Sequence, residues 1–342
     1  MSLTAFPRAH PRLIVPETAG IVGTVHVGPG VLVAQGTVVR SRGGSVAIGA
    51  GSAVLENSAV VGTPDSPVTV GRRSVFGHRC LVVGAAVGDL CEIGNGSILL
   101  PGARLGDRCF LGEGTLVPAG ARISDEAVVV GRPARQVRRA NAADLARLRG
   151  LRDGNLDVPA AELHPHTGRV PAGGNMGKRY AYRDKMPAIA PGTVLFDSAE
   201  ITGDVVIGGG SIIGAGVKIL GDSHGPVRIG ARVQILENSV LHLLPDNELI
   251  LEDDVIVGPG CMIHGCRIGA GSVVEPGAIV CDFSRLGRGC IVRAGAVVKQ
   301  RSEFGDGVAV DGFPAVAVER LAGPPPVPSW AFSLDDLPEA LP

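Results

Sequence analysis

Three histidines lie at complementary positions in two copies of one repeated segment. When the 342-residue chain is shifted by 181 residues, Gly49–Pro133 aligns without a gap with Gly230–Pro314. In this alignment His78 of the first copy meets Pro259, whereas His242 and His264 of the second copy meet Val61 and Val83. An imidazole can bind a divalent metal ion or act as a general base. The complementary distribution is the main indication of function in this sequence.

A six-residue period predicts the elements that must position these histidines. Aliphatic residues recur every six positions through both copies, and each is usually followed by a small residue. A period of six fits neither a helix nor simple strand alternation, and it is typical of a parallel β-helix. We therefore predict an all-β protein with two tandem parallel β-helices, in which each coil has roughly 18 residues and inward-pointing aliphatic side chains. The hexad positions are Val87, Ile93, Leu99, Leu105, Leu111, Val117, Ile123 and Val129, then Ile268, Val274, Val280, Leu286, Val292, Val298 and Phe304.

The remaining segments divide the chain into four parts. We expect the first β-helix over residues 12–138 and the second over 191–322. Residues 139–190 hold a short helix over Asn141–Arg152, capped by Asn141, followed by a polar connector. The helix is expected to pack along the first β-helix. Residues 323–342 are proline-rich and are expected to form an extended strap.

Composition and charge exclude several classes of partner. With 32 basic and 33 acidic residues, the chain has no excess positive charge that would indicate binding to nucleic acid or to a charged membrane surface. It lacks a signal-peptide-like stretch near its start and any apolar run of about 18 residues, so we expect a cytoplasmic protein. Its seven cysteines are odd in number and have no CxxC spacing, so packed, reduced thiols are expected.

The repeats resemble the left-handed β-helix hexapeptide-repeat superfamily, which includes acyltransferases and γ-class carbonic anhydrases. Three segments are similar to the carbonic anhydrase branch in particular: Val240-Leu241-His242, the stretch Val257–Gly269 with its internal His264, and Phe76-Gly77-His78. An Arg-Gly-Asp-like turn of that branch is divided between the copies. In the first copy, Arg40 stands at the arginine position of this turn. In the second copy, Leu220-Gly221-Asp222 matches the Gly-Asp of the turn.

The resemblance implies a shared metal site. In that family the metal lies between neighbouring subunits of a trimer, so His78, His242 and His264 are the implied ligands of Zn²⁺ or a similar divalent ion. Arg40 and Asp222 would pair across the interface, and Glu237, like Glu56, would orient ligands. Three imidazoles leave a fourth position for water. Zinc-hydroxide addition to CO₂ or a similar small electrophile is the implied reaction, in a homo-oligomer with a trimer favoured.

Symmetry opposes the simplest form of this site. A ring of three identical first copies offers only His78, and a ring of second copies offers only His242 and His264. A complete site therefore needs a contact between a first copy and a second copy. Two alternatives stay open: a hexapeptide-repeat acyltransferase that uses an acyl-CoA donor and one histidine as base, and a non-catalytic scaffold whose sites have decayed.

Overall fold

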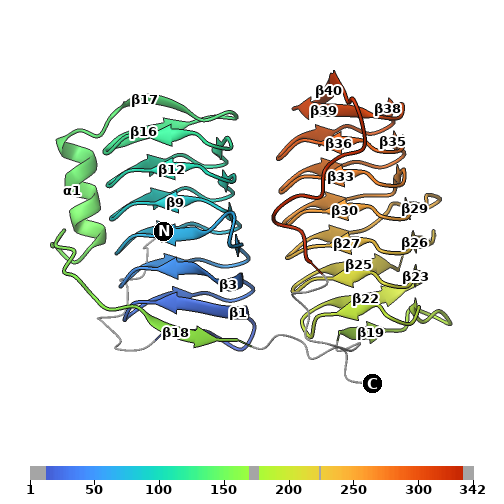
Figure 1. The fold of residues 1–342 in the computed structure, drawn as a ribbon, viewed down its shortest axis with the longest axis horizontal. Helices are drawn as coiled ribbons and strands as arrows, with labels where there is room; N and C mark the ends of the chain where they lie inside the picture. The colour runs from blue at the N-terminus through green and yellow to red at the C-terminus, as the bar shows by residue number, and fades with distance from the viewer. Residues whose placement is uncertain (1–12, 169–176, 223–224, 334–342) are drawn as a thin grey trace. The chain divides into compact units, whose positions relative to one another are not determined.

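The protein is an all-β molecule with one short helix. The computed structural model describes residues 13–168, 177–222 and 225–333. Two compact units, Met1–Arg169 and Val170–Pro342, are evident, and each is a parallel β-helix (Figure 1). The predicted fold class is therefore confirmed.

The first unit winds its chain into two sheets that enclose three faces. One sheet has the order β17-β16-β13-β10-β7-β4-β2, and the other has β14-β11-β8-β5-β3-β6-β9-β12-β15. The long strand β3 bends round one corner and so joins two faces. The strands of the first sheet are β2 (Leu32–Val33), β4 (Ala53–Val54), β7 (Val75–Phe76), β10 (Glu92–Ile93), β13 (Phe110–Leu111), β16 (Ala127–Val130) and β17 (Arg135–Arg139). Those of the second sheet are β3 (Val38–Ile48), β5 (Ala59–Gly62), β6 (Val68–Val70), β8 (Leu81–Val83), β9 (Ala86–Val87), β11 (Ile98–Leu99), β12 (Arg104–Leu105), β14 (Leu116–Val117) and β15 (Arg122–Ile123).

The lower end of the first unit in Figure 1 is closed by two strands that join this second sheet. Strand β1 (Gly20–Val27) pairs in parallel with β3, and β18 (His164–Thr167) pairs antiparallel with β1. The upper end is closed by β17, which turns back antiparallel to β16. Both ends therefore finish on an antiparallel strand, as edge-protecting caps do.

The second unit has three separate sheets, one for each face. The first holds β19 (Lys178–Tyr180), β22 (Glu200–Gly203), β25 (Lys218–Gly221), β28 (Val240–Leu241), β31 (Met262–Ile263), β34 (Ile279–Val280) and β37 (Val297–Val298). The next holds β20 (Ala188–Ile189), β23 (Val205–Ile207), β26 (Val227–Ile229), β29 (Leu249–Leu251), β32 (Arg267–Ile268), β35 (Arg285–Leu286) and β38 (Glu303–Phe304). The last holds β21 (Val194–Leu195), β24 (Ile212–Ile213), β27 (Gln234–Ile235), β30 (Ile256–Val257), β33 (Val273–Val274), β36 (Ile291–Val292), β39 (Val308–Gly312) and β40 (Ala315–Arg320).

The second β-helix starts earlier than its hexads indicate. Strands β19 and β20 lie inside the stretch 139–190, where a connector was expected. Their side chains are mostly exposed because this first coil has a neighbouring coil on one side only. The aliphatic pattern is weak where burial is weak, so the sequence period misses this coil.

Each unit has its own aliphatic core made of the hexad residues. Thirteen of the predicted hexad side chains are buried in the two cores, and only Ile123 and Phe304, in the last coils, are partly buried. Coils stack in register about 18 residues apart, as where Glu92 pairs with Phe110. Inward side chains of successive coils therefore contact one another along the whole β-helix.

Corners of the coils need unusual backbone conformations. Asn57 and Asn238, which are equivalent in the two copies, both have φ of 57°. Glycine and asparagine adopt this left-handed region more readily than other residues do. Arginines such as Arg73 and Arg232 also occupy it, with φ of 54° and 56°, and the sequence did not indicate this.

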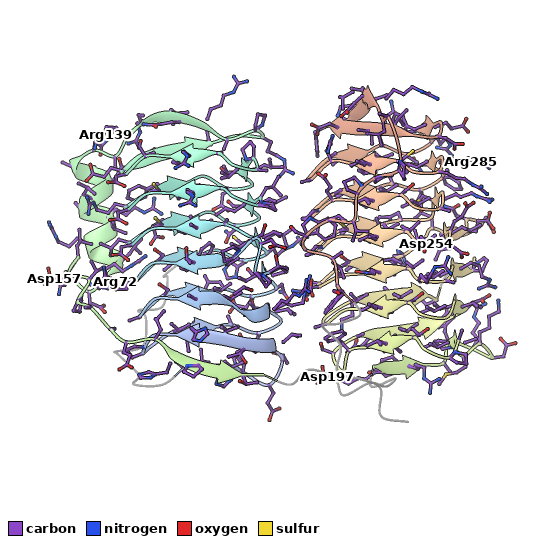
Figure 2. All side chains as sticks on the ribbon, viewed as in Figure 1. Arg72, Arg139, Asp157, Asp197, Asp254 and Arg285 are labelled. Atoms are coloured by element: carbon purple, nitrogen blue, oxygen red, sulfur yellow. The ribbon has the colours of Figure 1, made fainter. Side chains whose placement is uncertain are left out.

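Helix α1 (Ala142–Leu151) covers one face of the first unit, as predicted. Asn141 caps it in a capping box with Asp144, and Leu148 is fully buried. Just beyond the helix, Arg152 forms an ion pair with Glu92 of β10. The segment after the helix also binds the coils, since Arg73 donates to the carbonyl of Asp157 at 2.9 Å. Asp157 is labelled in Figure 2, close to Arg72 of the same coil. Within the described parts of the chain, no helix is long and apolar enough to cross a membrane.

The proline-rich tail runs back along the second unit (Figure 1). Trp330 and Phe332 are buried, and the Phe332 ring lies 5.3 Å from that of Phe196. The Gln234 side chain of β27 hydrogen bonds to both the N–H and the carbonyl of Phe332. These contacts make the tail a strap over one face of the second unit. Residues 334–342 lie outside the described part of the chain.

Candidate functional site

Coil stacking brings His242 and His264 to one corner of the second unit. His242 directly follows β28, and His264 directly follows β31, the neighbouring strand in the same sheet. The two imidazole rings lie edge to face with 6.0 Å between their centroids. Both side chains are about one-third exposed, at 35% and 29%. The corner therefore presents two adjacent, accessible imidazoles.

Two carboxylates lie behind these imidazoles. Asp222 Oδ1 is 3.7 Å from Nε2 of His242, and Asp282 Oδ2 is 3.4 Å from Nδ1 of His264. Asp222 Oδ1 is buried, and no described residue donates a hydrogen bond to it. A carboxylate beside a ligand imidazole orients the ring and leaves its other nitrogen free. The arrangement suits both histidines to hold a cation.

Asp282 also anchors the loop between β28 and β29. Its Oδ1 accepts from the N–H of Leu244 and from Nδ2 of Asn247, both at 3.2 Å. Asn247 Nδ2 donates as well to the carbonyl of Gly265, at 2.6 Å. The loop is thereby fixed to the residue that follows His264, and it borders the corner.

His78 occupies a different kind of corner in the first unit. It follows β7 in the turn that leads to β8, and its Nδ1 lies 2.7 Å from Oε2 of Glu56. The ring is half exposed, and the main-chain N–H of His78 donates to Oδ1 of Asn95. Nδ1 of this imidazole therefore lies beside a buried carboxylate oxygen, to which no described residue donates a hydrogen bond.

The three predicted ligands cannot meet within one β-helix. Pro259, the counterpart of His78, precedes β31, and His264 follows the same strand. The two positions are therefore at opposite ends of one face, roughly 16 Å apart at about 3.3 Å per residue. Among the described residues, no group of three or more His, Cys, Asp or Glu side chains is placed to hold a metal. The structure joins His242 with His264 and leaves His78 with Glu56.

The other predicted site residues, Arg40, Glu237 and Asp222, lie at corners equivalent either to that of His242 and His264 or to that of His78 and Glu56. Arg40 is buried on β3, beside Val61 in the ladder, so it lies at the corner that corresponds to His242. Glu237 is buried at the turn before β28, the corner that corresponds to Glu56. Asp222 alone of the three lies near the paired histidines.

Asp282 was missed by the sequence reasoning, although a signal for it exists. It lies 18 residues after His264, which is one coil length, so stacking places it near His264. Its counterpart in the first copy is Pro101, and the comparison of histidines alone did not reveal it.

A pocket of about 460 Å³ is bordered by the loop that follows His242 and by the residue after His264, although neither histidine lines it. It is lined by the loop residues Asp246 and Glu248, by Gly265 next to His264, and by Arg267 and Arg285 from β32 and β35. Figure 2 shows Arg285 on the outer surface of the second unit. The pocket offers room for a small molecule beside the corner.

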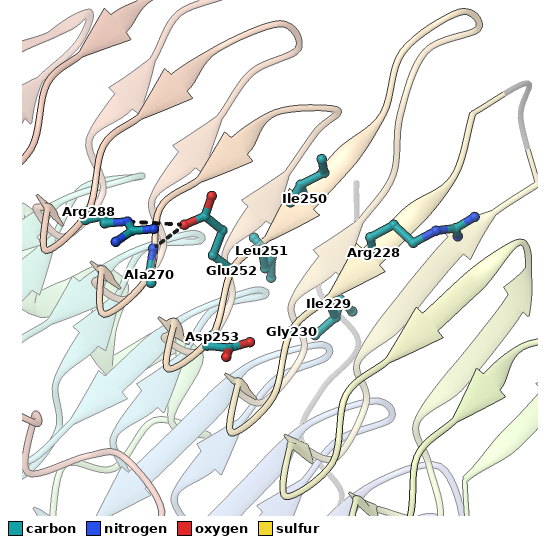
Figure 3. Close-up of a pocket in the computed structure, with 9 residues that line it drawn as sticks. All are labelled: Arg228, Ile229, Gly230, Ile250, Leu251, Glu252, Asp253, Ala270 and Arg288. Atoms are coloured by element: carbon teal, nitrogen blue, oxygen red, sulfur yellow. Dashed lines mark hydrogen bonds and ion pairs between the residues drawn. The ribbon is translucent and has the colours of Figure 1, made fainter.

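A second pocket, of about 410 Å³, lies at a different corner of the same unit (Figure 3). Its Glu252 carboxylate accepts from the N–H of Ala270 and lies 3.9 Å from Arg288. Arg267 also pairs with Glu252, and these contacts hold the pKa of Glu252 below its usual value. The carboxylate is thus already satisfied and offers no reactive group.

Comparison with known proteins supports the class that this fold defines. Residues 265–300 match the family model for bacterial transferase hexapeptide (six repeats), and residues 67–101 match that for the hexapeptide repeat of succinyl-transferase. A carbonic anhydrase of Geobacillus kaustophilus is 41% identical over 103 residues, which cover 30% of this chain and 56% of that protein. Protein YrdA of Escherichia coli is 40% identical over 108 residues, which cover 30% and 58%.

Transferase-like relatives occur beside the carbonic anhydrase. The uncharacterized transferase YtoA of Bacillus subtilis is 44% identical over 89 residues, covering 26% of this chain and 52% of that protein. A solved putative acetyltransferase of Bacillus cereus is 35% identical, covers 42% of this chain and 84% of its own, and superposes with a TM-score of 0.42. The chain spans about half the length of the curated relatives it matches.

The fold and these matches together define the class. The protein is a tandem hexapeptide-repeat protein with left-handed β-helices. It belongs to the superfamily that contains the γ-carbonic anhydrases and the hexapeptide acyltransferases.

Proposed function

We propose that the chain is a γ-carbonic anhydrase-like metalloenzyme that hydrates CO₂ or a similar small electrophile. The observation that carries this proposal is the pair of carboxylate-backed imidazoles, His242 and His264, at one corner of the second unit. Similarity to a carbonic anhydrase supports it.

The geometry of the pair fits a tetrahedral metal ion. Two imidazoles that share such an ion at about 2.0–2.1 Å have ring centroids roughly 5 Å apart. The observed 6.0 Å is within about an ångström of this separation. Oδ1 of Asp222 lies buried at the same corner, and no described residue donates a hydrogen bond to it. A bound cation would give this oxygen a partner. His242 and His264 would hold the ion, and Zn²⁺ would supply the Lewis acidity that activates water near neutral pH.

A third imidazole has to come from outside this corner. His78 is the candidate that the sequence offers, because it is absent from the second copy where His242 and His264 are present. Glu56 would then fix its ring through Nδ1, leaving Nε2 for the metal. In this proposal His78 is supplied by another β-helix in an oligomer of the chain.

Metal analysis of the full-length protein tests the proposal. We expect tight zinc binding by the parent and its loss in His78→Ala, His242→Ala and His264→Ala, because two imidazoles form an incomplete shell. His164→Ala, an exposed histidine of β18, serves as the control and should keep its metal. Retention of zinc by His78→Ala would remove the first unit from the site, and a parent without zinc would contradict the metalloenzyme.

Acyl transfer is the second candidate, and the Glu56–His78 contact favours it. An exposed imidazole backed by a carboxylate at 2.7 Å is an arrangement that suits a general base. The similarity to YtoA, a named transferase, agrees with this. Release of free CoA from acetyl-CoA with candidate acceptors, abolished in His78→Ala and unaffected by chelators, would decide for this reaction.

A further inference from the structure

We infer that Asp282 is a positioning residue that fixes which ring nitrogen of His264 carries the proton, so that the other is free to bind metal. The inference rests on the proposed metal site and adds a residue and a role to it. Asp282 has no counterpart in the first copy, where Pro101 stands.

Asp282 is buried, and its two oxygens have different partners. Its side chain is only 10% exposed. Oδ1 accepts from two donors at 3.2 Å, the N–H of Leu244 and Nδ2 of Asn247. The second donor is fixed, because the same Nδ2 also donates to a carbonyl oxygen, that of Gly265. Oδ2 is left facing Nδ1 of His264 at 3.4 Å.

The chemistry of this arrangement selects one tautomer of His264. A carboxylate only accepts, so the ring nitrogen that faces it is favoured as N–H. With the proton on Nδ1, the lone pair of Nε2 is available to a cation. A neutral imidazole on its own would populate both tautomers, and only one of them can bind through Nε2.

Asparagine at position 282 should reverse this choice. Two donors face the Oδ1 position, so the amide oxygen of Asp282→Asn is held there and its NH₂ group turns towards His264. The NH₂ group needs an acceptor, which moves the proton of His264 from Nδ1 to Nε2 and blocks the metal-binding nitrogen. Asp282→Ala removes the bias without reversing it.

The two substitutions therefore separate positioning from structural support. If Asp282 positions the proton, zinc affinity falls about 10- to 100-fold in Asp282→Asn and falls less in Asp282→Ala. If Asp282 only anchors the loop, the order is opposite, because alanine loses both bonds to Leu244 and Asn247 while asparagine keeps them. Asp254→Asn is the control, since Asp254 pairs with Arg232 on the surface of the same unit.

The experiment is zinc competition against a chromophoric chelator, with full-length parent, Asp282→Asn, Asp282→Ala and Asp254→Asn. Nitrogen-15 NMR of His264 in the metal-free parent is a second readout, and we expect the proton on Nδ1. A loss in Asp282→Ala equal to or larger than that in Asp282→Asn overturns the inference and leaves the metal site standing. A proton on Nε2 in the parent also overturns it, even where a variant fails to fold. A parent that binds no zinc contradicts the proposed function instead.

Discussion

At the scale of single residues, the two copies carry complementary histidines, and carboxylates lie near each of the three. His242 and His264 share a corner with Asp222 and Asp282, while His78 has Glu56. Each imidazole has a carboxylate within 3.7 Å, although the three come from different coils. Decay of both sites would not be expected to preserve such a pairing at all three of these histidines. The pairing instead suits imidazoles whose orientation matters.

Glu56 tests that reasoning in the first unit. We expect Glu56→Gln to lower zinc affinity about 10-fold or more, because the amide no longer favours a proton on Nδ1 of His78. Chelator competition on the full-length protein measures the change. Glu113→Gln, at an exposed position of the same corner three coils later, is the matched control. Unchanged affinity in Glu56→Gln would mean that His78 binds no metal, or that it needs no carboxylate.

The sequence pointed to most residues of the proposed site but not to how the coils arrange them. Matching the copies singled out His78, His242 and His264, because residue type alone distinguishes them from their counterparts, and Asp222 came from the resemblance of Leu220-Gly221-Asp222 to the family's turn. Asp282 depended on coil stacking, since its partner is a full coil away and its neighbours in sequence are ordinary repeat residues. The buried states of Arg40 and Glu237 were also beyond the pattern, because a hexad shows which side chains point inward but not how closely a corner packs.

At the scale of elements, the corners limit what the coils accept. Hexad period and cap chemistry were enough to predict the β-helices and α1, because both depend on local spacing. The antiparallel closing strands and the face covered by the tail were not predictable, because they depend on contacts between distant segments such as Phe332 and Phe196. The glycines that follow β32, β35 and β38 show how tight one stacked corner is.

A pair of glycine substitutions measures this tightness. A Cβ at Gly269 would lie 2.5 Å from the backbone of Gly287 in the next coil, whereas a Cβ at Gly305, in the last coil of the same corner, meets nothing within 4 Å. We expect Gly269→Ala to destabilise the second unit by about 1–3 kcal/mol, as overpacking against backbone does. Gly305→Ala, the matched control, should be neutral or stabilising by up to about 1 kcal/mol. Urea unfolding measures both, and equal effects would contradict the stacking.

At the scale of the whole molecule, each β-helix has one face covered by a segment of its own chain. Helix α1 covers a face of the first unit, and the tail covers one of the second. On the face of the second unit that ends at His242 and His264, Val240, Met262, Ile279 and Val297 alternate with core residues and therefore point outward. The neighbouring face instead presents Arg228, Arg267 and Arg285 together with Val206 and Ile250. An aliphatic column next to the corner of His242 and His264 favours association through that face.

This column leads to a prediction about assembly. We expect the protein to be an oligomer in solution, with a trimer favoured, because flat aliphatic faces of β-helices are poorly suited to water. Multi-angle light scattering at micromolar concentration measures the mass. Ile279→Glu should shift the mass towards the single chain and lower zinc binding with it, because a buried unpaired carboxylate opposes association and the third ligand is then lost. Arg285→Glu, on the charged face, should keep the parent mass and metal. A single-chain mass for the parent would contradict the prediction, and dissociated Ile279→Glu protein that still binds zinc as tightly as the parent would show that the third ligand comes from the same chain.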